Sequence, residues 1–123
     1  MSNDLTEIEL IIAHDTASAR QALEAALKAG RRVLLASPPE TSAAMGPGMF
    51  AECIDAAKAG LEQAFAGAVF DCGDAAGLAM AALRRGGMDV VSDLAGDARA
   101  KIEELARAQG RRAWRRAELE VLA

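Results

Sequence analysis

The chain has 123 residues, of which 52% are hydrophobic and only 3% aromatic, and its formal net charge at pH 7 is −4. This length allows one domain with a substantial core. The negative charge argues against nucleic acid as a main partner, because phosphate binding requires a clustered positive field. No apolar run approaches the roughly 18 residues of a membrane-spanning helix, so we expect no membrane partner.

Short apolar runs alternate with amphipathic segments along the chain. The apolar runs predict strands, in chain order, over Glu7–Ala13, Val33–Ala36, Ala66–Phe70 and Met88–Val91. Apolar residues at helical spacing predict helices over Thr16–Ala29, Pro47–Leu61, Ala75–Leu83 and Gly96–Ala108. Strands that alternate with helices, without hairpin signals between them, indicate right-handed crossovers and a mainly parallel sheet.

We therefore predict a single α/β domain over residues 1–123. It is a compact (βα)4-type three-layer domain with a mainly parallel four- or five-stranded sheet, either a half-barrel or an open doubly wound sheet. The tail, residues 111–123, leaves two alternatives open. Trp114, Ala117 and Val121 have helical spacing, whereas Glu118–Ala123 is patterned like the first strand. An open sheet has edges that need covering, so we expect a homodimer that buries Trp114 or a sheet edge.

The carboxyl ends of the predicted strands are the expected location of a site, because parallel α/β folds bind ligands there. Acidic and small polar residues follow these ends, whereas arginine pairs precede the strands at the opposite edge. We expect a cleft that binds a small molecule through side chains and loop amides. The candidate ligand-binding residues are His14, Ser37, Gly46, Gly48, Asp71, Gly73 and Ser92.

Asp71 is the acidic residue at this edge that a structural role explains least. Asp15, Asp74 and Asp93 stand where helix N-caps belong, and we expect them to cap. Asp71 instead ends a buried strand, where a carboxylate lowers stability unless it is paired. Asp71 and His14 are therefore the candidates for a catalytic general base.

Several kinds of chemistry find no support. His14 is the only histidine, which excludes a zinc site with several imidazoles. The sequence lacks a G-x-S-x-G elbow, a P-loop and a G-x-G-x-x-G motif, and its lysines lie within predicted helices, away from strand ends. We expect no cofactor and no resident metal. One alternative stays open: Mg²⁺ held by Asp71 and Asp93 could join an anionic ligand to this edge.

The two cysteines, Cys53 and Cys72, form no C-x-x-C pair, and the first seven residues lack a basic signal-peptide region. We expect reduced thiols and a cytoplasmic protein. Cys72 lies before a predicted helix, which favours a thiolate, but the carboxylates of Asp71 and Asp74 raise the pKa of a neighbouring thiol. We predict that Cys72 is structural. The connection Ser37–Met45 is either a lid over the site or a surface loop.

Residues 69–93, VFDCGDAAGLAMAALRRGGMDVVSD, resemble one strand–helix–strand unit of the phosphate-binding (βα)8 barrels. In those barrels a strand that ends in an acidic residue and a glycine precedes an "ALxAGxDxVV"-like segment, here ALRRGGMDVV. The chain departs from them by supplying four units, too few for closure by eight strands. The pattern is also similar to short uncharacterised bacterial α/β proteins with a "GPGMF" loop and a "DCGDAxGLAxAALRxG" segment, a resemblance that implies no particular activity.

These features lead to two expectations about function. The first is a non-catalytic metabolite-binding or subunit-like protein, with its cleft at the carboxyl ends of the strands. The alternative is a small enzyme that uses Asp71 or His14 as its general base.

Overall fold

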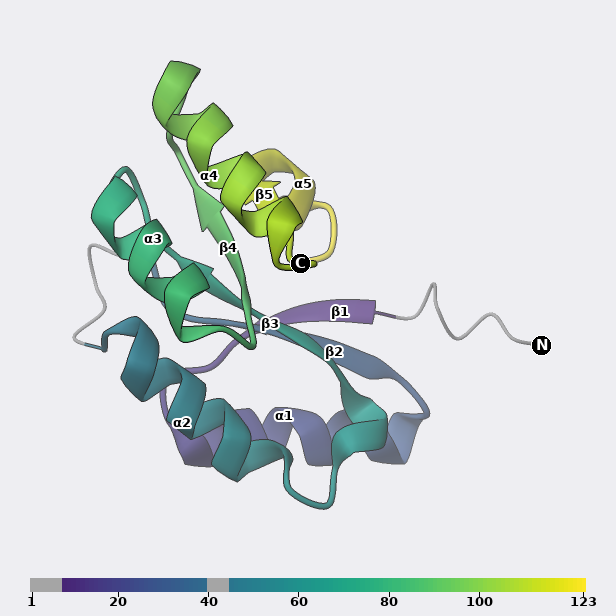
Figure 1. Cartoon of the computed structure of the whole chain (residues 1–123). Helices are drawn as coiled ribbons and strands as arrows, with labels where there is room; N and C mark the ends of the chain where they lie inside the picture. Colours follow the sequence, from purple (N-terminus) through teal and green to yellow (C-terminus); the bar gives the residue numbers. More distant parts are fainter. Residues whose placement is uncertain (1–7, 40–44) are drawn as a thin grey trace.

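The structure is a computed structural model, and it describes residues 8–39 and 45–123. Strands and helices alternate as the sequence predicts (Figure 1). The elements are β1 (Ile8–Ile12), α1 (Thr16–Ala29), β2 (Arg32–Ala36), α2 (Pro47–Lys58), the 3₁₀ turn η3 (Glu62–Ala64), β3 (Phe65–Asp71), α3 (Ala76–Arg85), β4 (Asp89–Ser92), α4 (Gly96–Ala108), β5 (Ala113–Arg115) and α5 (Arg116–Glu120). Among the described residues, no helix has the length and apolar character needed to cross a membrane.

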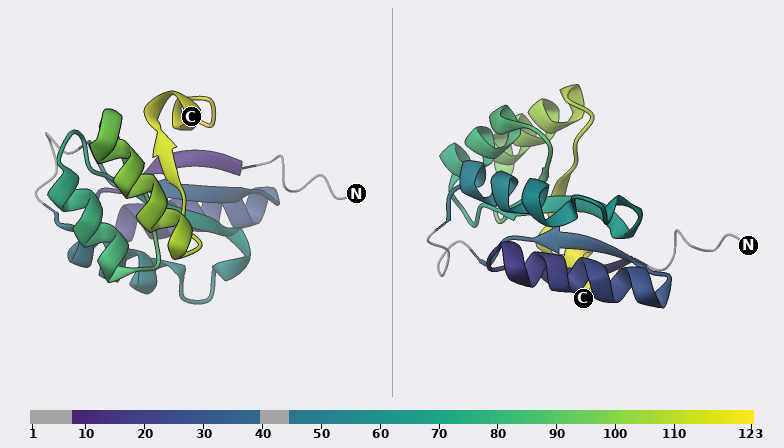
Figure 2. Two further views of the ribbon diagram at one scale, coloured as in Figure 1. Left: turned by 45° about the horizontal axis from the view of Figure 1, so that its top comes forward. Right: turned by 90° about the horizontal axis from the view of Figure 1, so that it is seen from below.

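The sheet confirms the predicted α/β class. Its five strands are all parallel and lie in chain order, β1-β2-β3-β4-β5. Helices α1 to α4 pack on one face, and α5 covers the other, which gives three layers (Figure 2). Of the two predicted alternatives, this arrangement is the half-barrel: its strands lie in chain order and its crossover helices lie on one face. A doubly wound sheet carries crossover helices on both faces.

Side chains alternate between the two faces of each strand, and this alternation divides the core into two clusters. The larger cluster lies between the sheet and α1–α4 and includes Leu35, Phe70 and Val90. The smaller cluster lies under α5, where Leu34, Val69 and Val91 surround Leu119. The second cluster depends on the last eight residues of the chain, because Leu119 is the one buried member, among the described residues, that lies outside the sheet.

The tail differs from both sequence-based alternatives. The fifth strand is β5, upstream of the segment Glu118–Ala123 that looked like a strand, and the residues after it form the short helix α5. Trp114 explains the position of β5: it pairs in register with Val91, and its indole N–H donates to Asp89 at 3.0 Å. The chain then crosses the sheet, where the carbonyl of Leu122 accepts a hydrogen bond from the amide of Leu10 in β1 at 3.1 Å.

Only one of the three predicted aspartate caps is observed. Asp15 caps α1, accepting a hydrogen bond from the Ser18 amide at 2.7 Å. The predictions for Asp74 and Asp93 are wrong. Helices α3 and α4 begin after Ala75 and Ala95, and neither helix has a side-chain cap. Asp93 has a different partner, described below.

Candidate functional site

The carboxyl ends of the strands form one continuous edge of the sheet, as predicted. Backbone hydrogen bonds continue the parallel pairing just beyond the strands. In each case a backbone N–H donates to the carbonyl oxygen of a residue on the neighbouring strand. The pairs are Ala13 to Ala36 at 2.8 Å, Ser37 to Val69 at 3.0 Å and Cys72 to Val91 at 2.9 Å. The residues that follow these strands therefore share this edge, which we call the carboxyl edge.

Asp71, the last residue of β3, is only 6% exposed, and local bonds hold it in place. Its amide donates to the hydroxyl oxygen of Ser37 at 2.7 Å, and its carboxylate Oδ1 accepts from the amide of Gly73 at 3.0 Å. Gly73 adopts a φ of 56°, which glycine reaches without the strain that a side chain brings. The Gly73 carbonyl accepts from Asp93 N–H at 2.7 Å, so one turn positions both aspartates.

The partner of both carboxylates is Arg116, the first residue of α5. Its NH1 and NH2 groups donate to the two oxygens of Asp71 at 2.9 Å each. Its Nε and NH2 groups donate to the two oxygens of Asp93 at 2.8 and 3.0 Å. The guanidinium is therefore held by two carboxylates, each contacted through both oxygens, the strongest geometry that an arginine–carboxylate pair adopts.

This arrangement controls the charge of the carboxyl edge. Hydrogen bonds from Arg116 hold the pKa of Asp93 below its ordinary value. The carboxylates of Asp71 and Asp93 in turn raise the pKa of Arg116, so the guanidinium stays charged. The expected buried carboxylate is thus paired, and Asp71 is not free to act as a general base in this structure.

Sequence reasoning missed Arg116. It lies 45 residues from Asp71 in the chain, within a tail that contains three other arginines at positions 111, 112 and 115. Local spacing carries no signal that distinguishes one of these from another. The available clue was the energetic one, that a buried carboxylate at the end of β3 needs a cation from elsewhere in the chain.

Cys72 is fully buried beside this pair, and its Sγ donates to the carbonyl of Phe70 at 3.5 Å. Burial first, and the charge of Asp71 second, raise the pKa of the Cys72 thiol to about 12. A thiol with this pKa is protonated at neutral pH and is a poor nucleophile. The structural role predicted for Cys72 has the support of this environment.

Ser92 and Asp71 lie on opposite faces of the sheet. Asp71 pairs in register with Val91, so the next side chain, Ser92, points toward the helices. There its hydroxyl accepts from Arg99 of α4 at 3.5 Å. Arg99 is only 6% exposed, and it also bonds Glu103 at 2.8 Å and the carbonyl of Ala113 at 3.1 Å. Ser92 thus belongs to a buried polar group that anchors β5.

The remaining candidates lie on the surface of the carboxyl edge. His14 is exposed, and its amide donates to the Ser18 hydroxyl at 2.9 Å. Gly46 and Gly48 begin α2 and are exposed, and α2, like α3 and α4, has no side-chain cap. Amides in the first turn of an uncapped helix are available to a ligand. Part of the connection from Ser37 to Met45, residues 40–44, lies outside the described residues, and with it the lid prediction.

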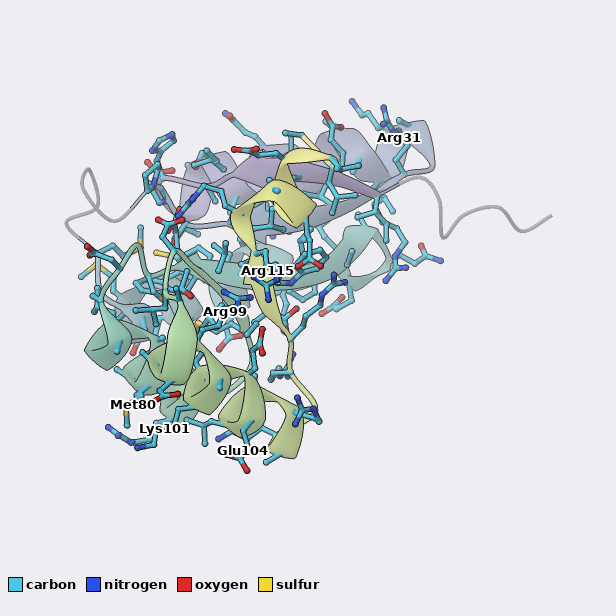
Figure 3. The ribbon with its side chains drawn as sticks, turned by 90° about the horizontal axis from the view of Figure 1, so that it is seen from above. Arg31, Met80, Arg99, Lys101, Glu104 and Arg115 are labelled. Carbon is cyan, nitrogen blue, oxygen red and sulfur yellow. The ribbon has the colours of Figure 1, made fainter. Side chains whose placement is uncertain are left out.

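A separate hollow lies on the outer helical layer. A groove of about 460 Å³ between α3 and α4 is lined by Met80, Lys101, Ile102, Glu104, Leu105 and Ala108. Figure 3 shows Met80, Lys101 and Glu104 together on this outer side, far from Arg31. Its lining is largely apolar side-chain surface and includes none of the predicted site residues.

The described part of the chain contains no cluster of three or more His, Cys, Asp or Glu side chains that could hold a metal ion. No protein-family model, curated protein or solved structure matches the chain. The resemblance of residues 69–93 to barrel units therefore stays an expectation from the sequence.

Proposed function

We propose that this protein is a non-catalytic binding protein, with its site at the carboxyl edge of the sheet. One observation carries the proposal: Arg116 is bound by both Asp71 and Asp93. The pairing occupies the strongest general-base candidate and offsets one of the two negative charges that Asp71 and Asp93 place at this edge. The Cys72 thiol next to Asp71 supports the same proposal, because its raised pKa keeps it protonated at neutral pH and a protonated thiol is a poor nucleophile.

A small molecule at this edge would contact the groups that the fold leaves exposed. These are the imidazole of His14 and the first amides of α2, next to Gly46 and Gly48. Two other predicted binding residues, Gly73 and Ser37, form hydrogen bonds within the protein instead. The amide of Gly73 donates to Asp71, and the hydroxyl of Ser37 accepts from the amide of Asp71. We infer that they shape the edge and do not contact the ligand directly.

A subunit-like role as a cytoplasmic homodimer is the second candidate, and the open sheet favours it. Strands β1 and β5 lie at opposite ends of the sheet order, and unpaired strand edges favour pairing with another chain. The outer edge of β1 is partly occupied, because the amide of Leu10 donates to the carbonyl of Leu122. Residue Ile12 of β1 is 45% exposed. Trp114 is the weaker anchor for a dimer, because Arg112 stacks on its ring at 3.7 Å within the same chain.

The direct test is thermal unfolding of the unaltered protein in the presence of a panel of small metabolites. A saturable increase in Tm that is lost in His14→Ala supports a site at the carboxyl edge. His14→Ala alone should fold normally, since His14 is exposed. A panel without any shift contradicts ligand binding. Light scattering over a range of concentrations separately tests the homodimer, and a monomer at every concentration contradicts it.

The enzyme alternative has its own discriminating variant. If Asp71 were a general base in a transient open state, Asp71→Asn would abolish a turnover that depends on pH. The non-catalytic proposal is contradicted if the unaltered protein turns over a compound of the panel and Asp71→Asn does not. The Tm of Asp71→Asn must still respond to that compound, which shows that binding is retained.

A further inference from the structure

The sheet edges and Trp114, which the sequence favours as a dimer surface, are partly occupied within the chain. The carbonyl of Leu122 accepts from the amide of Leu10 at the outer edge of β1. At the other end of the sheet, β5 has three residues, and Arg112 stacks on the ring of Trp114. An open apolar surface lies elsewhere, in the groove between α3 and α4.

This groove has an apolar base between two neighbouring helices of the outer layer (Figures 1 and 2). Ile102 is buried, Leu105 is partly buried, and Met80 beside them is 40% exposed. The unbranched side chain of methionine adapts its shape to a surface that packs against it. The groove, with a volume of about 460 Å³, can therefore receive an apolar element from another molecule.

Two side chains of opposite charge flank the groove on the exposed face of α4, namely Lys101 and Glu104 (Figure 3). They are three residues apart, about 4.5 Å along the helix axis. In the described part of the chain, neither side chain has a hydrogen bond or an ion pair, whereas the neighbouring Glu103 bonds Arg99 at 2.8 Å. The two charges are therefore available to a partner.

These two charges are complementary to a second copy of themselves. In a two-fold dimer, a residue pair that forms in one direction across the interface also forms in the other. Two antiparallel α4 helices that cross midway between Lys101 and Glu104 place each lysine opposite the glutamate of the other copy. Parallel helices in register would place like charges opposite each other, which is unfavourable.

We propose that the groove between α3 and α4 is the interface of a homodimer, in which two copies pack these helices antiparallel across a two-fold axis. Four helices, two from each copy, form a small bundle. Met80 and Leu105 are buried against the second copy, and two pairs between Lys101 and Glu104 form at the rim. The inference rests on the homodimer given above as the second candidate function, and it places the interface on the helical layer.

Charge reversal at the rim tests this arrangement. Lys101→Glu and Glu104→Lys each convert two pairs of opposite charge into two pairs of like charge. Each variant alone should therefore raise the dissociation constant of the dimer by about tenfold or more. Both positions are exposed, so both variants should fold normally. Mixed in equal amounts, the two variants restore both pairs of opposite charge and should form a heterodimer, which sedimentation equilibrium measures.

Two further variants separate the groove from other surfaces. Met80→Glu places a charge in the apolar part of the interface and should abolish association. Lys28→Glu makes the same charge change as Lys101→Glu, but on the exposed last turn of α1. It is the matched control and should leave the dissociation constant unchanged.

Three results would overturn the inference. The first is a monomer at every concentration, which also contradicts the homodimer candidate. The second is a dimer that Met80→Glu leaves intact, or a mixture of the two charge variants that associates no better than each variant alone; the homodimer candidate then stands with a different interface. The third is a monomer whose Tm rises with a panel compound and no longer does so in Met80→Glu, because the groove then holds a small molecule.

Discussion

Arg116 donates two hydrogen bonds of 2.9 Å to the carboxylate of Asp71, although 45 residues separate the two in the chain. The contact joins the end of β3 in the middle of the sheet to the first residue of the last helix. It satisfies a carboxylate that the fold buries, and it fixes the start of a tail that crosses the sheet. Stability and the chemistry of the carboxyl edge therefore depend on the same pair.

Replacement of Arg116 by alanine should destabilise the protein. The change leaves the buried Asp71 carboxylate without its cation, which costs about 2–4 kcal/mol, less than for a fully buried pair because Arg116 is partly exposed. Urea unfolding measures the difference. Arg107→Ala, on the exposed last turn of α4, is the matched control and should stay within about 0.5 kcal/mol of the unaltered protein. Equal stability of the two variants would contradict a structural role for the pair.

The stability of the folded protein should decrease at low pH, partly because Asp93 becomes protonated. Arg116 holds the pKa of Asp93 below its ordinary value of 3.8 in the folded state. The resulting stability is present above the ordinary pKa and is lost as the pH falls through the lowered one, because the unfolded chain binds the proton first. We expect Tm to fall less steeply below about pH 5 in Arg116→Ala than in the unaltered protein. Parallel Tm curves for the two proteins would show that Asp93 is not the titrating group.

Cys72 should resist alkylation as long as the protein is folded. Its pKa is raised to about 12 and its side chain is buried, so neither the thiolate nor access is available near pH 7. Iodoacetamide labelling, followed by mass spectrometry in a Cys53→Ala background, measures the rate. The same protein in urea gives the rate for an accessible thiol. If folded Cys72 is labelled at or above that rate, the prediction is wrong and Cys72 is a reactive nucleophile.

The last turn of the chain offers a matched pair of positions for testing the layer formed by α5. Leu119 is 5% exposed and packs on Leu34, Val69 and Val91, whereas Val121, two residues later, is 81% exposed. We expect Leu119→Ala to cost about 2–4 kcal/mol and Val121→Ala to change the stability by less than about 0.5 kcal/mol. Chemical denaturation compares them, and a similar small cost for both would mean that the tail does not stabilise the sheet.

The sequence by itself determined the first four strands, the helices between and after them, and the edge where polar residues gather. Helices α1 and α4 have the predicted bounds, because local periodicity and the glycines that follow or begin them carry the signal. The polar residues after β1 to β4 share one edge because parallel strands all end there. These properties depend on neighbours within a few residues, or on a rule of topology.

Only the tertiary structure decided what the acidic edge contains. It chose the half-barrel order over the doubly wound one, placed β5 at Ala113–Arg115, and turned Ser92 away from Asp71. Above all, it selected Arg116 from four arginines in the tail as the partner of Asp71 and Asp93. The pairing of charges distant in sequence depends on how the tail crosses the sheet, and the packing of Leu119 against Leu34, Val69 and Val91 contributes to fixing that path. Because that packing exists only in the folded chain, the spacing of residues along the sequence could not reveal it.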